Sequence, residues 1–366
     1  MKPVAFLALV VVTSAAAAFV ACDSNDSNAL DAGDAGASDD AVVAKSCPLA
    51  TPTLAADTSG LAQNGAQCGQ PAFAWLSDPS LGDVTHTAGE QTLPASGLSV
   101  LVAASGVTTT GPLLDVTVEQ FTYKTQDRGA PLDASGLVAF PSGSTTQTSY
   151  DTLLVLHGTA GFTDACAPSS DPNSRQLIAA LASLGFIVVA PDYIGLRALE
   201  GPTGFLHPYL VGQPTALASL DSVRAAQKLV AARPDGTCAS GRFVTVGGSQ
   251  GGHAALWVDR LAPYYAPELE LDGVVATVPP ADLVGESNLA LTQEIPASEN
   301  AAAFFAASSD WYGTRPVLSQ ALVPPLDVDL PDAMAQTCDP SPQLAGKTLA
   351  ETFAAPLLAA AQSDAG

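Results

Sequence analysis

Short apolar runs recur at regular intervals through the middle of the chain and predict the strands of a sheet. Hydrophobic and polar residues alternate over residues 116–124, as in a half-buried strand, and residues 135–140 predict a second strand that ends before Pro141. Four further runs are almost wholly apolar, which is typical of parallel strands covered on both faces. They lie at residues 152–156, 186–190, 242–246 and 273–278.

Segments with helical spacing separate these strands. Residues 174–184 are amphipathic and stop at Gly185, a residue type that commonly follows the last turn of a helix. Residues 214–232 predict a long helix, and residues 250–261 predict another that starts soon after the strand at 242–246. Because strands and helices alternate, the sequence predicts an α/β fold in which helices cover both faces of a mostly parallel sheet.

The pattern is weaker at the two ends of the predicted catalytic core, residues 46–282. Residues 46–111 are rich in Gly, Pro and Thr and predict an irregular N-terminal wrap. From residue 283 the chain is Ala-rich and interrupted by Pro, which indicates a helical cap over an active site. No apolar strand is recognisable in residues 283–366, so we expect the C-terminal strands of the sheet to be missing and the cap to be truncated.

The first 45 residues predict export. A signal peptide is predicted over residues 1–22. It has a positive charge at Lys2, an apolar run at residues 4–12 and small residues before Cys22. A small residue directly before Cys22 resembles a bacterial lipobox, in which the cysteine is lipidated. Ordinary cleavage and an uncleaved anchor helix are the alternatives. Residues 23–45 contain almost no large apolar side chains, so they predict a disordered acidic linker.

The charge balance excludes several partners. The chain carries 13 basic and 36 acidic residues, a formal net charge of −23, with no basic cluster that could neutralise phosphates. We therefore expect no nucleic acid, and a membrane contact only through a lipid anchor at the N-terminus. Strong acidity fits an extracytoplasmic protein, either anchored in the cell envelope or secreted.

Cysteine and histidine positions predict no metal site and no cofactor. Five cysteines remain when Cys22 is set aside, so one is free or is paired outside the chain. Disulfides are allowed in an exported protein, and Cys47 with Cys68 is a plausible local pair. No spacing typical of zinc ligands occurs, and the four histidines are scattered.

Residues 247–251, Gly-Gly-Ser-Gln-Gly, carry the strongest chemical signal. They follow a predicted buried strand and precede a predicted helix, the context in which Gly-x-Ser-x-Gly forms a nucleophile elbow. The tight turn exposes the serine hydroxyl above the sheet and needs small residues two positions on either side. We therefore predict that Ser249 is the nucleophile of a serine hydrolase. A plain Gly-rich loop is the alternative.

A second loop is predicted to complete the site. Residues 157–161, His-Gly-Thr-Ala-Gly, follow the strand at 152–156, at the position where this architecture supplies one oxyanion N–H group. The residue after the nucleophile supplies the other. We assign these donors to Thr159 and Gln250. Asp192 and Asp221 are expected to fix loops through hydrogen bonds.

Five motifs in this order resemble the secretory lipase family of the α/β-hydrolases. They are His-Gly-Thr at 157–159, Ala-Pro-Asp-Tyr-Ile-Gly at 190–195, His-Pro-Tyr-Leu at 207–210, Asp-Ser-Val-Arg-Ala-Ala at 221–226 and Gly-Gly-Ser-Gln-Gly-Gly at 247–252. The resemblance implies the α/β-hydrolase fold with a cap, hydrolysis of carboxylic esters including acylglycerols, Ser249 as nucleophile, and a disulfide between Cys166 and Cys338.

The chain departs from that family in its triad. The family places its acid and histidine beyond the cap, whereas no histidine follows His253 in this sequence. Asp282, at the end of the last predicted strand, is a candidate acid. Three hypotheses stay open: a truncated lipase-like ester hydrolase, an unusual base such as His157 or a partner's group, and a lipid-anchored pseudoenzyme. A serine peptidase or amidase of the same fold is a further alternative.

Overall fold

The computed structural model describes residues 47, 75–109, 111–142, 148–234 and 236–363. The predicted signal peptide with Cys22, the predicted linker at 23–45 and Cys68 lie outside these ranges. Within them, no helix combines the length and the apolar character that crossing a membrane requires.

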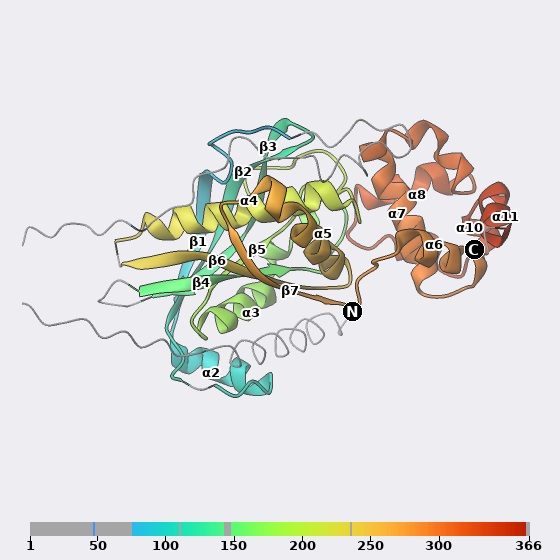
Figure 1. Ribbon diagram of the computed structural model, residues 1–366. Helices are drawn as coiled ribbons and strands as arrows, with labels where there is room; N and C mark the ends of the chain where they lie inside the picture. Colours follow the sequence, from blue (N-terminus) through green and yellow to red (C-terminus); the bar gives the residue numbers. More distant parts are fainter. Residues whose placement is uncertain (1–46, 48–74, 110, 143–147, 235, 364–366) are drawn as a thin grey trace, which may run out of the picture.

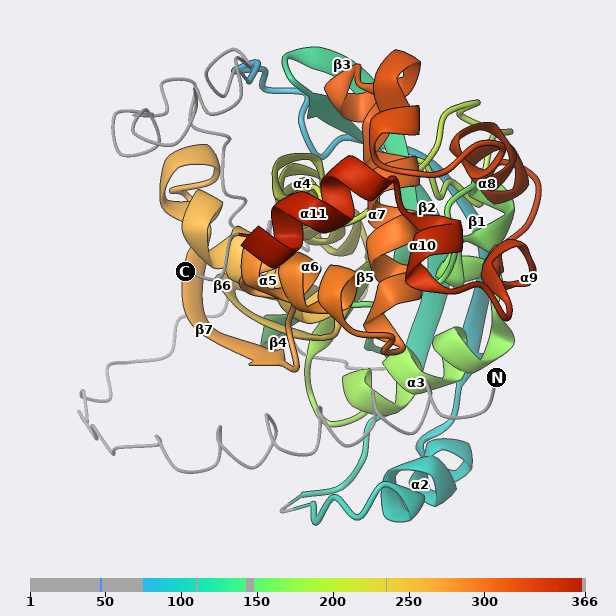
Figure 2. The same ribbon diagram turned by 90° about the vertical axis from the view of Figure 1, so that its right-hand side faces the viewer.

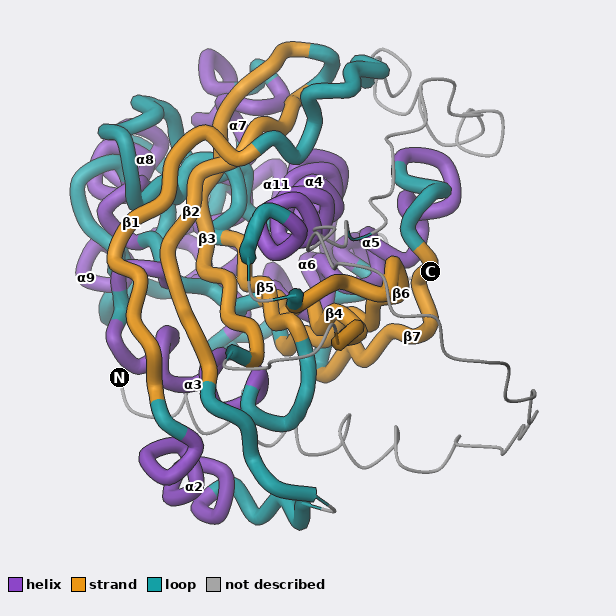
Figure 3. Tube along the Cα trace, turned by 90° about the vertical axis from the view of Figure 1, so that its left-hand side faces the viewer, coloured by secondary structure: helices purple, strands orange, loops and turns teal. Residues whose placement is uncertain are grey.

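The described chain is built on a seven-stranded sheet with the order β1-β2-β3-β5-β4-β6-β7 (Figures 1 and 3). The first three strands and β5 pair antiparallel, while β5, β4, β6 and β7 are parallel. The strands are β1 (Val84–Leu93), β2 (Val116–Asp127), β3 (Ala130–Pro141), β4 (Thr148–Leu156), β5 (Ile187–Pro191), β6 (Thr237–Gly248) and β7 (Glu270–Thr277). Six of these strands are the predicted ones.

Helices cover both faces of the sheet, as the alternating pattern predicts. On one face, α4 (Gly212–Ala231) and α5 (Gln250–Tyr265) pack over Phe121, Tyr123 and Phe243. On the other face, α2 (Ala95–Ala104) and α3 (Pro172–Ala182) pack over Val116, Val118 and further apolar strand residues. Phe121 and Tyr123 of β2 thus face one layer of helices, and Val116 and Val118 face the other. This follows because successive side chains of a strand point to opposite faces of the sheet.

Residues 84–104 differ from the predicted irregular wrap, because they form β1 and α2. The sequence of β1, Val-Thr-His-Thr-Ala-Gly-Glu-Gln-Thr-Leu, is mostly polar, and most of its residues are exposed. An edge strand needs only one paired neighbour and can leave much of its surface in solvent. It therefore lacks the apolar periodicity from which strands are recognised.

Residues 283–363 form a helical cap beside the carboxyl ends of the parallel strands (Figures 1 and 2). Its apolar core contains Leu322, Leu330, Met334 and Phe353 and also receives Phe162, Tyr209 and Leu210 from loops of the α/β core. The helices are α6 (Leu283–Thr292), α7 (Ala297–Tyr312), α8 (Leu326–Met334), α9 (Ser341–Leu344), α10 (Leu349–Thr352) and α11 (Ala355–Ser363), with the short 3₁₀ helix η5 (Arg315–Gln320).

Two covalent links hold distant parts of the chain together. Cys166 is bonded to Cys338, the pair that the family resemblance implies, and it ties the loop after β4 to the cap. The predicted local pair of Cys47 with Cys68 is wrong, because Cys47 is bonded to Cys238, 191 residues away. Cys238 is buried near the start of β6, and only the folded chain brings it to within a Cα separation of 5.4 Å from Cys47.

A polar contact also joins the core to the cap. The indole N–H of Trp311, near the end of α7, donates to both carboxylate oxygens of Asp127 at 3.0 and 3.1 Å. The Arg128 guanidinium donates to the Trp311 carbonyl oxygen at 2.8 Å and lies 4.4 Å from the centre of its ring. The turn between β2 and β3 therefore holds one end of the cap.

Candidate active site

Ser249 occupies a strained turn between β6 and α5. Its φ of 56° and ψ of −122° lie outside the ordinary regions for a residue with a side chain. Its N–H donates to the Thr277 carbonyl oxygen at 3.0 Å, which fixes the turn against β7. The Ser249 side chain is exposed, although the residues on either side are more buried. The sequence forms the predicted elbow, and the hydroxyl is accessible to solvent.

The glycines of this turn leave room for close backbone contacts. A Cβ atom at Gly247 would lie 2.1 Å from the Gly251 carbonyl oxygen. A Cβ atom at Gly251 would lie 2.1 Å from the Leu156 carbonyl oxygen at the end of β4. Real Cβ atoms do not come so close to backbone, so both positions exclude every other residue type unless the backbone moves.

The loop after β4 lies directly against the elbow. A Cβ atom at Gly158 would lie 3.5 Å from the Gly248 carbonyl oxygen and 4.0 Å from Ser249 Cβ. Thr159 follows and is exposed, like Ser249. Gln250 is the first residue of α5, where a backbone N–H has no partner within the helix. The structure thus brings the three residues assigned to nucleophile and oxyanion hole to adjoining turns, and their catalytic roles stay predictions.

None of the four histidines is hydrogen-bonded to the Ser249 hydroxyl among the described residues. His157 Nδ1 and Nε2 lie 2.7 and 3.2 Å from the carbonyl oxygens of Gly158 and Asp192. His253 Nδ1 lies 3.0 Å from the Pro280 carbonyl oxygen. Burial lowers the pKa of both imidazoles.

The other two histidines are also unsuited to proton transfer at Ser249. His207 is fully buried, with its ring nitrogens next to the Ile194 carbonyl oxygen and the Gln250 amide. His86 is exposed on β1, at the opposite edge of the sheet from β7. The described residues therefore offer no imidazole in position to act as the general base.

Asp282, the candidate acid, is the N-cap residue of α6. Its carboxylate accepts a hydrogen bond from the Gly285 N–H at 3.0 Å, and the residue is exposed. This contact accounts for the aspartate as a helix cap, since aspartate is among the residues preferred there. A role in catalysis stays a prediction for Asp282.

Asp192 fixes loops through hydrogen bonds, as expected from the sequence, whereas Asp221 lies within α4 and bonds to Thr125 of β2 and Tyr265 of α5 instead. The Asp192 carboxylate accepts from the hydroxyls of Ser135 and Ser169, at 2.7 and 2.6 Å, and from the Ser169 N–H at 2.7 Å. Burial raises the pKa of Asp192 to about 6, although these three donors favour the charged form. The carboxyl group joins β3 to the loops that follow β4 and β5.

We predict that Asp192 makes the protein less stable as the pH rises from about 4 to 6. The folded protein binds a proton at Asp192 more tightly than the unfolded chain, whose aspartates have a pKa of about 3.9, so this group disfavours folding by about 3 kcal/mol above pH 6. Relative to the unchanged protein, Asp192→Asn should therefore gain about 2 kcal/mol between pH 4 and pH 7, because about half of this aspartate is already ionised in the unfolded chain at pH 4. Urea unfolding at both pH values measures this gain, and an equal difference at the two values would contradict it.

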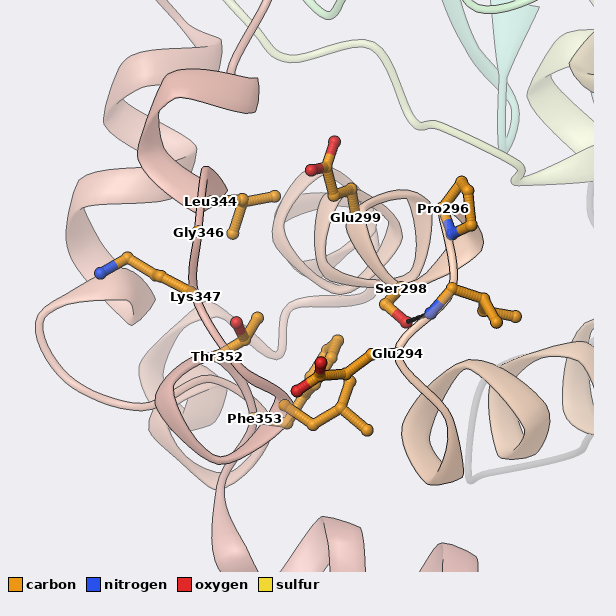
Figure 4. Close-up of a pocket in the computed structure, with 11 residues that line it drawn as sticks. Glu294, Pro296, Ser298, Glu299, Leu344, Gly346, Lys347, Thr352 and Phe353 are labelled. Carbon is orange, nitrogen blue, oxygen red and sulfur yellow. Dashed lines mark hydrogen bonds between the residues drawn. The ribbon is translucent and has the colours of Figure 1, made fainter.

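The structure places a pocket of about 290 Å³ in the cap (Figure 4). Its apolar lining includes Ile295, Leu344 and Phe353, and Glu294, Glu299 and Lys347 add charge. Ser249 does not line this pocket. Among the described residues, no group of three or more His, Cys, Asp or Glu side chains is arranged to hold a metal ion.

The sequence did not indicate that the His-Pro-Tyr-Leu motif, residues 207–210, contacts the predicted site residues. His207 and Tyr209 contact the elbow residue Gln250 and the loop residue Thr159, respectively. The motif was visible in the sequence, but its neighbours depend on which loops meet at the carboxyl edge of the sheet.

Comparisons with known proteins agree with this arrangement. Residues 173–297, from α3 to the first residue of α7, match the family model described as Secretory lipase. Lipase 7 of Candida albicans is 38% identical over 104 residues, a match that covers 28% of this chain and 22% of Lipase 7. The chain thus spans less than a quarter of the length of that relative.

Two solved structures share the fold. The rice cell wall degrading esterase LipA from Xanthomonas oryzae superimposes with a TM-score of 0.62 at 21% identity, over 78% of this chain and 76% of that chain. A putative hydrolase from Legionella pneumophila gives 0.61 at 19% identity, over 76% and 75% of the two chains. Residues 173–297 are therefore similar to the secretory lipases, and the chain shares the α/β-hydrolase fold of the two solved structures.

Proposed function

We propose that the protein is a serine hydrolase of carboxylic esters. The observation that carries this proposal is the strained turn at Ser249, which exposes the hydroxyl beside the Gly158 loop and the first N–H groups of α5. Relatedness to lipases supports esters as the substrate class. The exposed position of Ser249 would give a substrate direct access from solvent.

In the proposed reaction, the Ser249 oxygen attacks the ester carbonyl carbon and its proton passes to a base. The N–H groups of Thr159 and Gln250 would hold the negative oxygen of the tetrahedral intermediate, where loss of one such donor typically costs about 3–4 kcal/mol. The alkoxide leaves with a proton as the alcohol, and an acyl group remains on Ser249. Water then attacks the acyl group, one of its protons passes to the Ser249 oxygen, and the carboxylic acid is released.

We propose that none of the four histidines of this sequence is the general base. The ring nitrogens of His157 and His207 face groups other than Ser249, and His253 Nδ1 faces a backbone carbonyl. Without a base, a serine hydrolase retains only the rate enhancement of its oxyanion hole and substrate binding, which is about 10³- to 10⁴-fold over water. We therefore expect Ser249 and its two oxyanion donors to form a slow but correctly built acylation site.

Labelling with a fluorophosphonate tests this proposal, because a serine that can attack displaces fluoride from the probe and forms a phosphonate ester. We expect covalent mass on Ser249 that is absent from Ser249→Ala and increased by added imidazole. Imidazole can reach the hydroxyl because Ser249 is exposed. No labelling of Ser249 under any of these conditions would favour the pseudoenzyme, for which the lack of a positioned imidazole is the supporting observation.

Substrate class and location extend the proposal. An ester panel beside a matched amide panel separates the ester hydrolase from a peptidase or amidase, since acylation by either begins at the same serine.

The two disulfides are typical of an exported protein. We propose that lipidated Cys22 anchors it to the cell envelope, which mass spectrometry of the mature N-terminus would test.

A further inference from the structure

The segment 207–211 lies between the two loops that carry the assigned oxyanion donors. The His207 N–H donates to the Phe162 carbonyl oxygen at 2.8 Å, which ties the segment to the loop after β4. On its other side, a Cβ atom at Gly195 would lie 2.7 Å from both His207 N and Cα. Backbone thus packs closely against His207, and the residue has little freedom to move.

His207 holds the side chain of Gln250. Its Nδ1 lies 2.8 Å from the Ile194 carbonyl oxygen, which can only accept, so this nitrogen carries the hydrogen. The lone pair of Nε2 therefore accepts from the Gln250 amide nitrogen at 2.6 Å. Burial lowers the pKa of His207 to about 3, so the ring stays neutral and remains an acceptor at ordinary pH.

The orientation of Gln250 indicates that this contact fixes position. Gln250 is buried, and its Oε1 atom has no hydrogen-bond partner among the described residues. A buried amide oxygen without a donor is costly. Reversing the amide would place Oε1 against the Nε2 lone pair, so the contact to His207 allows only one orientation.

Tyr209 holds the other assigned donor residue. Its phenol oxygen lies 2.9 Å from the Thr159 hydroxyl oxygen. The Tyr209 ring is buried and packs edge-on against Phe162, with 5.3 Å between ring centres. The Tyr209 N–H also donates to the His207 carbonyl oxygen at 2.8 Å. One short rigid segment therefore contacts Thr159 through Tyr209 and Gln250 through His207.

We propose that His207 and Tyr209 are positioning residues that set the separation of the Thr159 and Gln250 N–H groups in the oxyanion hole. This inference rests on the proposed function. The two donors belong to different loops, one after β4 and one after β6, and residues 207 and 209 of one segment contact a side chain in each. Both donors must lie about 2.7–3.1 Å from the same oxygen atom, and an error of about 1 Å can cost about 100-fold in rate.

Four variants and two readouts test this brace. Tyr209→Phe removes only the phenol oxygen. Tyr264→Phe is its matched control, because Tyr264 lies near the C-terminal end of α5, whereas Ser249 and Gln250 lie at its N-terminal end. His207→Leu removes the acceptor for Gln250, whereas His207→Gln can restore one through its side-chain oxygen. The readouts are the rate constant for fluorophosphonate labelling of Ser249 in the presence of imidazole, and the thermal midpoint of unfolding.

We expect labelling to slow about 10-fold in Tyr209→Phe and up to about 100-fold in His207→Leu, with partial recovery in His207→Gln and no change in Tyr264→Phe. Tyr209→Phe should keep a thermal midpoint close to that of the unchanged protein, which separates positioning from folding. If Tyr209→Phe and His207→Leu are both labelled as fast as the unchanged protein, the brace is wrong and the proposed function stands. If the unchanged protein is not labelled at Ser249, the proposed function fails and the brace fails with it.

Discussion

Replacing Gly251 with alanine should reduce the reactivity of Ser249 by at least about 100-fold. The new Cβ atom would lie 2.1 Å from the Leu156 carbonyl oxygen, and this neighbour is backbone at the end of β4. Relief requires the start of α5 to move away from β4. That movement would displace both Ser249 and the Gln250 N–H, and a displacement of about 1 Å is enough for an effect of this size.

Gly97→Ala is the matched control for this change. Gly97 is an exposed residue within α2, and its nearest neighbour for an added Cβ is Pro94 Cγ at 3.9 Å, an ordinary contact. Alanine is favoured over glycine inside a helix by about 1 kcal/mol, so this variant should be at least as stable as the unchanged protein. Fluorophosphonate labelling rates and thermal unfolding compare the two. Equal labelling of Gly251→Ala and Gly97→Ala would show that the close contact at the elbow is not required.

Replacing Arg224 with alanine should destabilise the protein by about 3–5 kcal/mol, because it leaves buried acidic groups without their counter-charge. The guanidinium lies 2.6 Å from a carboxylate oxygen of Asp221 and 2.6 Å from one of Glu268. It also donates to the Tyr265 carbonyl oxygen at 2.8 Å. Asp221 is fully buried, and burial raises the pKa of its carboxyl group against the opposing effect of Arg224.

Arg242→Ala is the control for a loss of charge alone. Arg242 pairs with Asp151 at 2.7 Å, but its side chain is 51% exposed, and such pairs contribute at most about 1 kcal/mol. Urea unfolding of the two variants measures the difference. A cost below about 1 kcal/mol for Arg224→Ala would mean that the buried network adapts without its cation. The hydroxyls of Thr125 and Tyr265, which donate to the Asp221 carboxylate, would then have to compensate for the lost guanidinium.

The core strands could be predicted because burial imposes a local pattern. The short apolar runs that form β4, β5 and the second half of β6 are buried in the fold, because helices cover both faces of the sheet there. The run in β7 is also apolar, although this edge strand has no fully buried residue. The elbow could also be predicted, because one of its close contacts, that of Gly247 with the Gly251 carbonyl oxygen, lies within residues 247–251. By contrast, β1 is an exposed edge strand with little apolar content, so nothing in its sequence separates it from a loop.

The Thr159 loop lies beside Ser249 as the predicted architecture implies, because β4 and β6 are neighbours in the sheet although β5 lies between them in the sequence. Other contacts between distant segments could not be predicted. The bond from Cys47 to Cys238 and the contacts of His207 and Tyr209 depend on the same three-dimensional order. Residue spacing alone carries no information on such pairs.

We propose that Ser249 is the nucleophile of an acylation site in which the described residues place no imidazole at its hydroxyl. The most direct test is the rate constant for fluorophosphonate labelling of Ser249 in the 366-residue chain, measured with and without imidazole. The account predicts slow labelling alone, a rate that rises with the concentration of neutral imidazole, and no labelling at this position in Ser249→Ala. Labelling without imidazole at the rate of a complete serine hydrolase, or none even at high imidazole, would contradict it.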